Sequence, residues 1–198
     1  MNRTVFSLPE HSEYRTASGL AITRTVEQFT GGANRLDDLI DLLDRRRGVV
    51  LSSGTTVPGR YESFDLGFSD PQLQLETVGF DFSLQALNPR GEVLIAFLGD
   101  VLREPCVVIS ERSASRLGGH IVRGAAPVDE DQRTRRASVM SLVRDLVAAL
   151  AANDDPLLGL FGAFAYDLVF QIEDLVQKRA RERPARHPAV RAGSAVGL

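Results

Sequence analysis

Two adjacent hydroxyl side chains, Ser52 and Ser53, are the residues of this chain best suited to binding a small polar ligand. They follow the hydrophobic run 48–51, which predicts a buried strand, so their hydroxyls and nearby backbone N–H groups face a turn. An α-amino acid offers a carboxylate and an ammonium group to such partners. Arg60, later in the same turn-rich segment, either pairs with a carboxylate or anchors the loop. The same residues also fit a purely structural role, as a turn closing two strands.

Motifs of enzyme catalysis are missing from the sequence. It contains no G-x-S-x-G elbow, no P-loop, no dinucleotide-binding glycine motif and no H-E-x-x-H motif. The three His residues and the one Cys are scattered, which predicts no metal-ligand cluster. We interpret His120 as an ordinary strand residue and Cys106 as a small core residue. The sequence therefore predicts no catalytic residue.

The composition indicates one ordinary globular domain. The chain has 198 residues, of which 43% are hydrophobic and 25% charged, and this is enough to bury a core. A net charge of −3 does not indicate nucleic acid or an acidic membrane surface as partner. No apolar run approaches the roughly 20 residues of a membrane-spanning helix, and the N-terminus lacks the apolar core of a secretory signal. We therefore expect a cytoplasmic protein that binds neither nucleic acid nor membrane, and a single Cys fits that compartment.

Hydrophobic periodicity predicts the elements that hold these residues. Residues 35–46 carry leucines at helical spacing, with Asn34 as the N-cap, and 129–153 form a second amphipathic helix. Alternating or short apolar runs predict strands at 20–28, 48–51, 73–77, 80–84, 93–97, 105–109 and 118–122. Asn88–Gly91 reads as a hairpin turn. Because strands cluster instead of alternating with helices, the fold class is α+β, mostly antiparallel sheet with two or three amphipathic helices.

The C-terminal part of the sequence changes in character near its end. Residues 157–166 are apolar and contain Gly, which predicts a central strand, and Asp167 caps a short helix that runs to Leu175. Residues 179–198 consist largely of Arg, Ala, Pro and Gly and have no sustained period. This tail is interpreted either as a disordered basic segment or as out-of-frame translation, since shifted GC-rich codons give such a mixture.

Four sequence blocks, in this order, resemble the N-terminal region of anthranilate synthase component I. They are the early strand with Leu20 and Ile22, DLLDRRRGVVLSSG (41–54), VPGRYESFDLGFSDPQL (57–73) and FGAFAYDLVFQIEDL (161–175). The third block favours the bacterial type that is fused to its glutaminase. Two positions depart from the family pattern: Ala165 stands where Gly is usual, and Gln72 where a second Pro is usual.

The resemblance implies a domain organisation and a reaction. Residues 15–178 would be the N-terminal portion of the chorismate-utilising enzyme fold, between a flexible N-terminus (1–14) and the tail (179–198). The family converts chorismate and glutamine-derived ammonia to anthranilate and pyruvate in tryptophan biosynthesis, with Mg²⁺. It keeps its catalytic groups and Mg²⁺ ligands in a C-terminal chorismate-binding domain. That domain and the glutaminase domain are missing here, so we expect no cofactor in this chain and no activity of the chain alone.

What the resemblance carries over is the feedback site. Ser52 and Ser53 match the tryptophan-binding motif of the family, and Tyr166 is expected near it, which makes L-tryptophan the expected effector. Arg60 is a further candidate for a carboxylate or loop contact. Two alternatives stay open. In the first, the chain is a free-standing sensor of aromatic amino acids. In the second, it is a fragment of a related chorismate enzyme of the phenazine or aminodeoxychorismate pathway.

Overall fold

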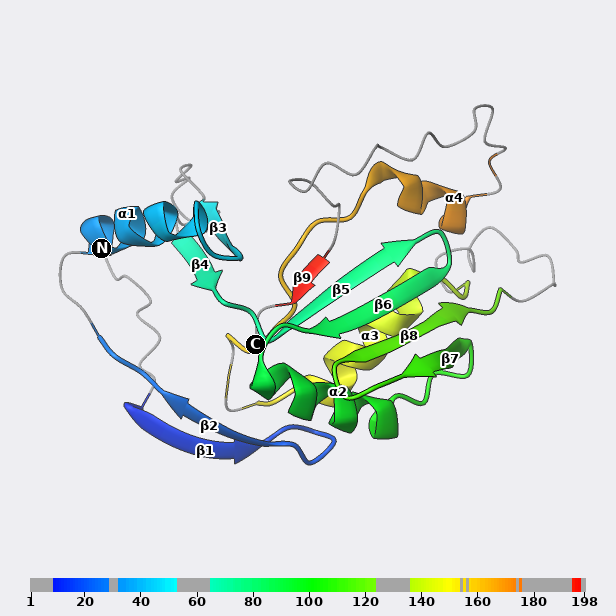
Figure 1. The fold of residues 1–198 in the computed structure, drawn as a ribbon, viewed down its shortest axis with the longest axis horizontal. Coiled ribbons are helices and arrows are strands. Elements are labelled where there is room, and N and C mark those ends of the chain that lie inside the picture. The colour runs from blue at the N-terminus through cyan, green and yellow to red at the C-terminus, as the bar shows by residue number, and fades with distance from the viewer. Residues whose placement is uncertain are drawn as a thin grey trace, which may run out of the picture.

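The described residues form three antiparallel sheets, with helices packed against two of them (Figure 1). The structure is a computed structural model that describes residues 9–28, 32–52, 65–123, 136–153, 155, 157–173, 175 and 194–196. The predicted α+β class, with mostly antiparallel sheet, is confirmed.

The first sheet is an N-terminal hairpin of β1 (His11–Arg15) and β2 (Ala21–Thr25). Its turn is closed by the N–H of Thr16, which donates to the carbonyl of Leu20 at 2.9 Å. The strand predicted at 20–28 is therefore present over a shorter range. The expectation of a flexible N-terminus over 1–14 is wrong for residues 11–14, because they pair with β2. Their sequence has almost no apolar residue, so periodicity did not reveal the strand.

The second unit is α1 (Gly32–Leu43) packed on a hairpin of β3 (Gly48–Ser52) and β4 (Asp65–Ser69). The predicted helix 35–46 is present, but it begins at Gly32, so Asn34 lies inside the helix and is not its cap. Packing is close, since a Cβ on Gly67 would lie 2.6 Å from a methyl group of Leu39. The prediction that β3 is buried is wrong, since Leu51 is 43% exposed. Among the described residues β3 pairs with β4 alone, and α1 is the helix packed on this two-stranded sheet.

A short corner at residues 70–72 joins β4 to the large sheet. Asp70 has a left-handed backbone (φ 55°), which an L-residue adopts at a cost and which Asp tolerates better than most. Its N–H donates to the carbonyl of Arg47 at 2.8 Å, and its carboxylate lies 2.5 Å from the guanidinium of Arg46. Arg47 also donates to the side-chain carbonyl of Gln74 in the next strand. The corner is thus held by two residues of the loop between α1 and β3.

The third sheet has the strand order β7-β8-β6-β5-β9. Its strands are β5 (Leu73–Val78), β6 (Asp81–Ala86), β7 (Val107–Arg112), β8 (Arg116–Ile121) and β9 (Ser194–Val196). Leu75, Leu84 and Leu117 are register partners across β5, β6 and β8, so all three point to the same face. The strands predicted at 73–77, 80–84 and 118–122 are confirmed to within a few residues. The strand predicted at 105–109 begins at Val107. β9 lies in the tail that was predicted to lack regular structure, and it pairs with β5.

The strand predicted at 93–97 and the turn at Asn88–Gly91 are wrong, because α2 (Pro89–Val101) occupies this range. The side chain of Asn88 caps the helix by accepting a hydrogen bond from the N–H of Gly91 at 3.1 Å. Leu94, Ile95 and Leu98 are buried while Val93 is 60% exposed, which is helical spacing. An Asn-Pro pair serves equally well as a turn or as a helix start, and here it starts a helix.

The helix predicted over 129–153 is α3 (Val139–Leu150), and its described part begins after a capping box of Ser138 and Ser141. Residues 124–135 lie outside the described residues. Leu142 and Leu146 of α3 are almost fully buried, as is Leu98 of α2, and all belong to one core cluster with the apolar face of the large sheet. Figure 1 shows both helices packed on this sheet.

The chain then continues through an irregular segment into η2 (Tyr166–Leu168) and α4 (Val169–Ile172). The central strand predicted at 157–166 is wrong: the structure gives residues 157–165 no strand pairing. A strand requires a hydrogen-bonded neighbour, which apolar composition alone cannot supply. The predicted helix 167–175 is shorter than expected and follows Ala165, and Leu175 is exposed.

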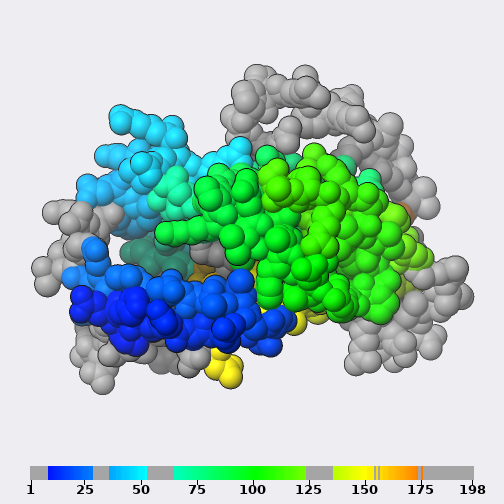
Figure 2. Space-filling model, turned by 60° about the horizontal axis from the view of Figure 1, so that its bottom comes forward, coloured from blue at the N-terminus to red at the C-terminus, as the bar shows by residue number. Residues whose placement is uncertain are grey.

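In the space-filling view the surface is hollowed between the blue N-terminal hairpin and the cyan α1 unit (Figure 2).

The register-aligned leucines set the stability of the large sheet. We expect Leu84→Ala, which removes a fully buried side chain, to lower the free energy of unfolding by about 3–5 kcal/mol. Val93→Ala on the exposed side of α2 is the matched control and should cost less than about 0.5 kcal/mol. Urea denaturation followed by circular dichroism measures both. Similar losses for the two variants would contradict the placement of the core.

Candidate functional site

Ser52 is the last residue of β3 and pairs with Asp65 in β4. Its side chain is exposed, so the hydroxyl is available to a ligand at the strand end. Ser53 and Arg60, the two other candidates of this region, lie outside the described residues. The predicted position of Ser52 at the end of a strand is therefore confirmed, while its binding role stays a prediction.

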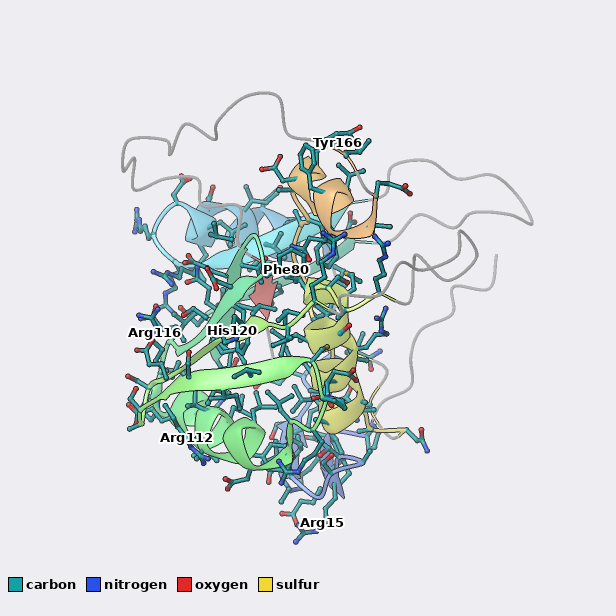
Figure 3. The ribbon with its side chains drawn as sticks, turned by 90° about the vertical axis from the view of Figure 1, so that its right-hand side faces the viewer. Arg15, Phe80, Arg112, Arg116, His120 and Tyr166 are labelled. Carbon is teal, nitrogen blue, oxygen red and sulfur yellow. The ribbon has the colours of Figure 1, made fainter. Side chains whose placement is uncertain are left out.

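Tyr166 begins η2 and is 87% exposed. Figure 3 shows its ring at the outer end of the η2–α4 turn, away from the large sheet. Within the described residues, no hydrogen bond or ring contact joins the side chains of Tyr166 and Ser52. Tyr166 thus presents a free aromatic face whose position depends on how its segment is held. We call residues 157–173 the Tyr166 segment.

An aromatic pair joins the Tyr166 segment to the hairpin that carries Ser52. The rings of Phe161 and Phe68 lie with centroids 5.5 Å apart at an interplanar angle of 47°, a separation typical of favourable aromatic pairs. Phe68 belongs to β4, the strand hydrogen-bonded to β3. The two parts of the chain predicted to form one site are therefore packed against each other, although their candidate side chains do not touch.

A buried ion pair holds the start of this segment to the N-terminal hairpin. The carboxylate of Asp155 accepts a hydrogen bond from the hydroxyl of Tyr14 at 2.5 Å and lies 2.8 Å from the guanidinium of Arg24. It also accepts from the N–H of Leu157 at 3.0 Å. The side chains of Asp155 and Arg24 are only 6% and 14% exposed, and the guanidinium lies 5.7 Å from the centre of the Tyr14 ring. This cluster links β1 and β2 to a segment far along the chain.

The surroundings of Asp155 favour its charged form. Burial alone raises the pKa of this carboxyl, because it penalises the charge. Hydrogen bonds from Tyr14 and the N–H of Leu157, together with the hydrogen bond and charge of Arg24, outweigh that effect, and the pKa of Asp155 is lowered. Sequence reasoning missed this cluster. The sequence feature that could have indicated the cluster is Arg24. It shares the inward face of β2 with Ile22, and a buried Arg requires an acidic partner.

A second buried polar residue, Gln171, holds the other end of the Tyr166 segment. Its side chain is 7% exposed and uses both ends of its amide. The carbonyl accepts from the N–H of Val139 at 2.9 Å, and the NH₂ group donates to the carbonyl of Gly79 at 2.6 Å. Sequence reasoning missed this residue as well. The sequence feature that could have indicated it is a single amide side chain between two apolar residues, Phe170 and Ile172.

His120 lies in a strand as the sequence predicts, whereas Cys106 lies in the turn before β7 and is only partly buried. His120 lies in β8 and is exposed. Cys106 is half-buried against the core cluster, and burial is the main cause that raises the pKa of its thiol. A raised thiol pKa leaves little thiolate at neutral pH, which disfavours a nucleophilic role.

Comparison with known proteins shows what the chain resembles. No protein-family model matches it. It is 41% identical over 175 residues to an anthranilate synthase of Azospirillum brasilense, covering 88% of this chain and 24% of that protein. It is 30% identical over 184 residues to the pyocyanine-specific anthranilate synthase component 1 of Pseudomonas aeruginosa, covering 92% of this chain and 30% of that protein. The chain is homologous to part of an anthranilate synthase.

The predicted resemblance to anthranilate synthase component I is thereby confirmed. The chain spans about a quarter to under a third of the length of these curated anthranilate synthases. In the part of the chain that the structure describes, no group of three or more His, Cys, Asp or Glu side chains is placed to hold a metal ion. These residues do not fit the Mg²⁺ that the resemblance implies. Every described helix is too short or too polar to cross a bilayer.

The Asp155 cluster makes a pH-dependent contribution to stability. Because the pKa of Asp155 is lowered on folding, its contribution is complete above the ordinary carboxyl pKa of about 4 and is lost as the pH falls through the folded value. We expect Asp155→Asn to destabilise the protein by about 3 kcal/mol at pH 7, since Arg24 is left buried without its counter-charge. The loss should shrink toward pH 3.

Asp100→Asn is the matched control for this prediction. Asp100 pairs with Arg112 at 2.7 Å, but both side chains are exposed, so its removal should cost less than about 1 kcal/mol. Urea denaturation at pH 7 and at pH 3 measures the free energy of unfolding of the parent chain and of both variants. Equal effects of the two substitutions would show that the Asp155 pair is not a buried one.

Proposed function

We propose that this chain is the tryptophan-binding, regulatory part of an anthranilate synthase. The observation that carries the proposal is the ring contact between Phe161 and Phe68. It packs the FGAFAYDL block against the hairpin that carries the serine block, although the two blocks lie far apart in the sequence. Both blocks belong to the resemblance, and their proximity supports a shared ligand site.

The chemistry of the described residues suits an aromatic amino acid. A strand end with the Ser52 hydroxyl and adjacent backbone groups offers partners to the ligand's carboxylate and ammonium. Tyr166 offers an exposed aromatic face to an indole ring, at the distances favoured by aromatic pairs. In this proposal Ser53 completes the polar end of the site and Arg60 contributes to the carboxylate contact.

The wider context is also part of the proposal. The complete enzyme would convert chorismate and glutamine-derived ammonia to anthranilate and pyruvate in the cytoplasm. It would need C-terminal chorismate-binding and glutaminase domains as partners of this part. Chemistry is assigned to those domains, so we expect the chain alone to be inactive.

A second candidate function has one observation in its favour. The Pseudomonas aeruginosa relative is named pyocyanine specific, which keeps open a fragment of a phenazine-pathway enzyme. Its identity of 30% is lower than the 41% of the Azospirillum brasilense protein, whose name carries no pyocyanine-specific qualifier, so we favour an anthranilate synthase outside the phenazine pathway. A free-standing sensor of aromatic amino acids would bind tryptophan in the same way but would act without a catalytic partner.

Calorimetric titration of the purified chain with L-tryptophan tests the proposal. We expect saturable heat from tryptophan and none from chorismate with Mg²⁺. Ser53→Phe should abolish the tryptophan heat by filling the site, and Tyr166→Ala should weaken binding about fivefold by removing the aromatic face. Tyr166→Ala should keep the unfolding transition of the parent chain, because Tyr166 is exposed. The unfolding transition of Ser53→Phe is recorded alongside it, so that lost binding can be told from lost folding.

Ser115→Phe is the control for added bulk. Ser115 is an exposed residue of the β7–β8 turn, so this variant should bind tryptophan normally. A parent chain that binds no tryptophan would sink the regulatory proposal and favour the phenazine-type fragment. Binding that survives Ser53→Phe would place tryptophan at another site.

A further inference from the structure

Gln171 is a buried polar residue that neither the core nor the proposed ligand contacts explain. It lies on α4 between Phe170 and Ile172, where an apolar side chain would match its neighbours. Its two hydrogen bonds reach different elements: the β5–β6 turn through Gly79 and the first residue of α3 through Val139. A buried amide is costly unless both ends are satisfied, so this arrangement is specific.

Only glutamine fits this position without loss. The N–H of Val139 lies in the first turn of α3, where backbone donors have no partner inside the helix, and it needs an acceptor. The carbonyl of Gly79 needs a donor. Glutamate at neutral pH offers acceptors only, and methionine offers neither a strong donor nor a strong acceptor. Gln171 therefore works as a two-sided clamp.

The clamp acts on the residue that the proposed site needs. Tyr166 and Gln171 belong to one continuous helical unit, η2 followed directly by α4, so fixing Gln171 fixes the direction of Tyr166. On the other side, Phe161 is held by Phe68. Tyr166 itself is exposed at the outer end of the turn, so it has few contacts of its own to hold it in place (Figure 3).

We propose that Gln171 is the positioning residue of the tryptophan site and that it sets the affinity by orienting Tyr166. This inference rests on the proposed function. Gln171 touches no ligand in it. The residue acts through the η2–α4 unit, which it ties to the β5–β6 turn and to α3.

Three variants of the full chain test the clamp by tryptophan titration at pH 8 and pH 5.5. Gln171→Met loses both hydrogen bonds and should weaken tryptophan binding about tenfold or more at both pH values. Gln171→Glu should be as weak at pH 8. At pH 5.5 its buried carboxyl, whose pKa burial raises, becomes neutral and can donate to Gly79 again, so affinity should recover. Gln85→Glu, at an exposed position of β6, is the control and should match the parent chain at each pH.

Hydrogen exchange of the amides in residues 166–173 gives a readout that does not need tryptophan. Exchange should accelerate in Gln171→Glu at pH 8, relative to the parent chain at that pH, and return to the parent rate at pH 5.5. If the parent chain binds no tryptophan, the proposed function fails, and with it the positioning role, while exchange still reports the clamp itself. Parent-like affinity in Gln171→Met, or in Gln171→Glu at pH 8, would overturn the positioning role. Should the Met variant not fold, the two pH values of the Glu variant make the same comparison.

Discussion

The large sheet has one apolar face, and the rest of the molecule is arranged around that constraint. Register brings Leu75, Leu84 and Leu117 side by side, and α2 and α3 must cover them to keep them from water. The opposite face carries polar partners such as Gln85 and Arg116. The N-terminal hairpin and the Tyr166 segment add only partly buried side chains to this core, Leu20 and Leu160, and both are held mainly by other contacts.

Those attachments are directional contacts and not broad apolar surfaces. Asp155 holds the hairpin through Tyr14 and Arg24, Phe161 meets a single ring of β4, and Gln171 bonds two backbone groups. Each contact fixes an orientation more than it adds stability, because burying polar groups costs much of what their hydrogen bonds return. Such a segment can present a ligand-binding side chain at a defined position while the fold beneath it stays unchanged.

The elements that were predicted correctly are those set by the pattern of their own residues. Period-two alternation identified β5 and β6, and leucine spacing identified α1. It failed at Asn88-Pro89, where one dipeptide fits a turn and a helix start equally well, and at 157–166, where strand formation depends on a neighbour. Ser52 was placed correctly at a strand end. Asp155 and Gln171 were missed because their partners lie far along the chain: Tyr14 is 141 residues from Asp155, and Gly79 and Val139 are 92 and 32 residues from Gln171. No single-sequence periodicity reports contacts over such separations.

The corner at Asp70 limits how this part of the chain can vary in length. Asp70 is tied to Arg46 and Arg47 in the loop between α1 and β3, and β5 begins only three residues later. One inserted residue here would move either the ion pair or the strand, and a one-residue slip would turn the buried leucines of β5 to the polar face. Natural insertions and deletions should therefore avoid residues 70–72.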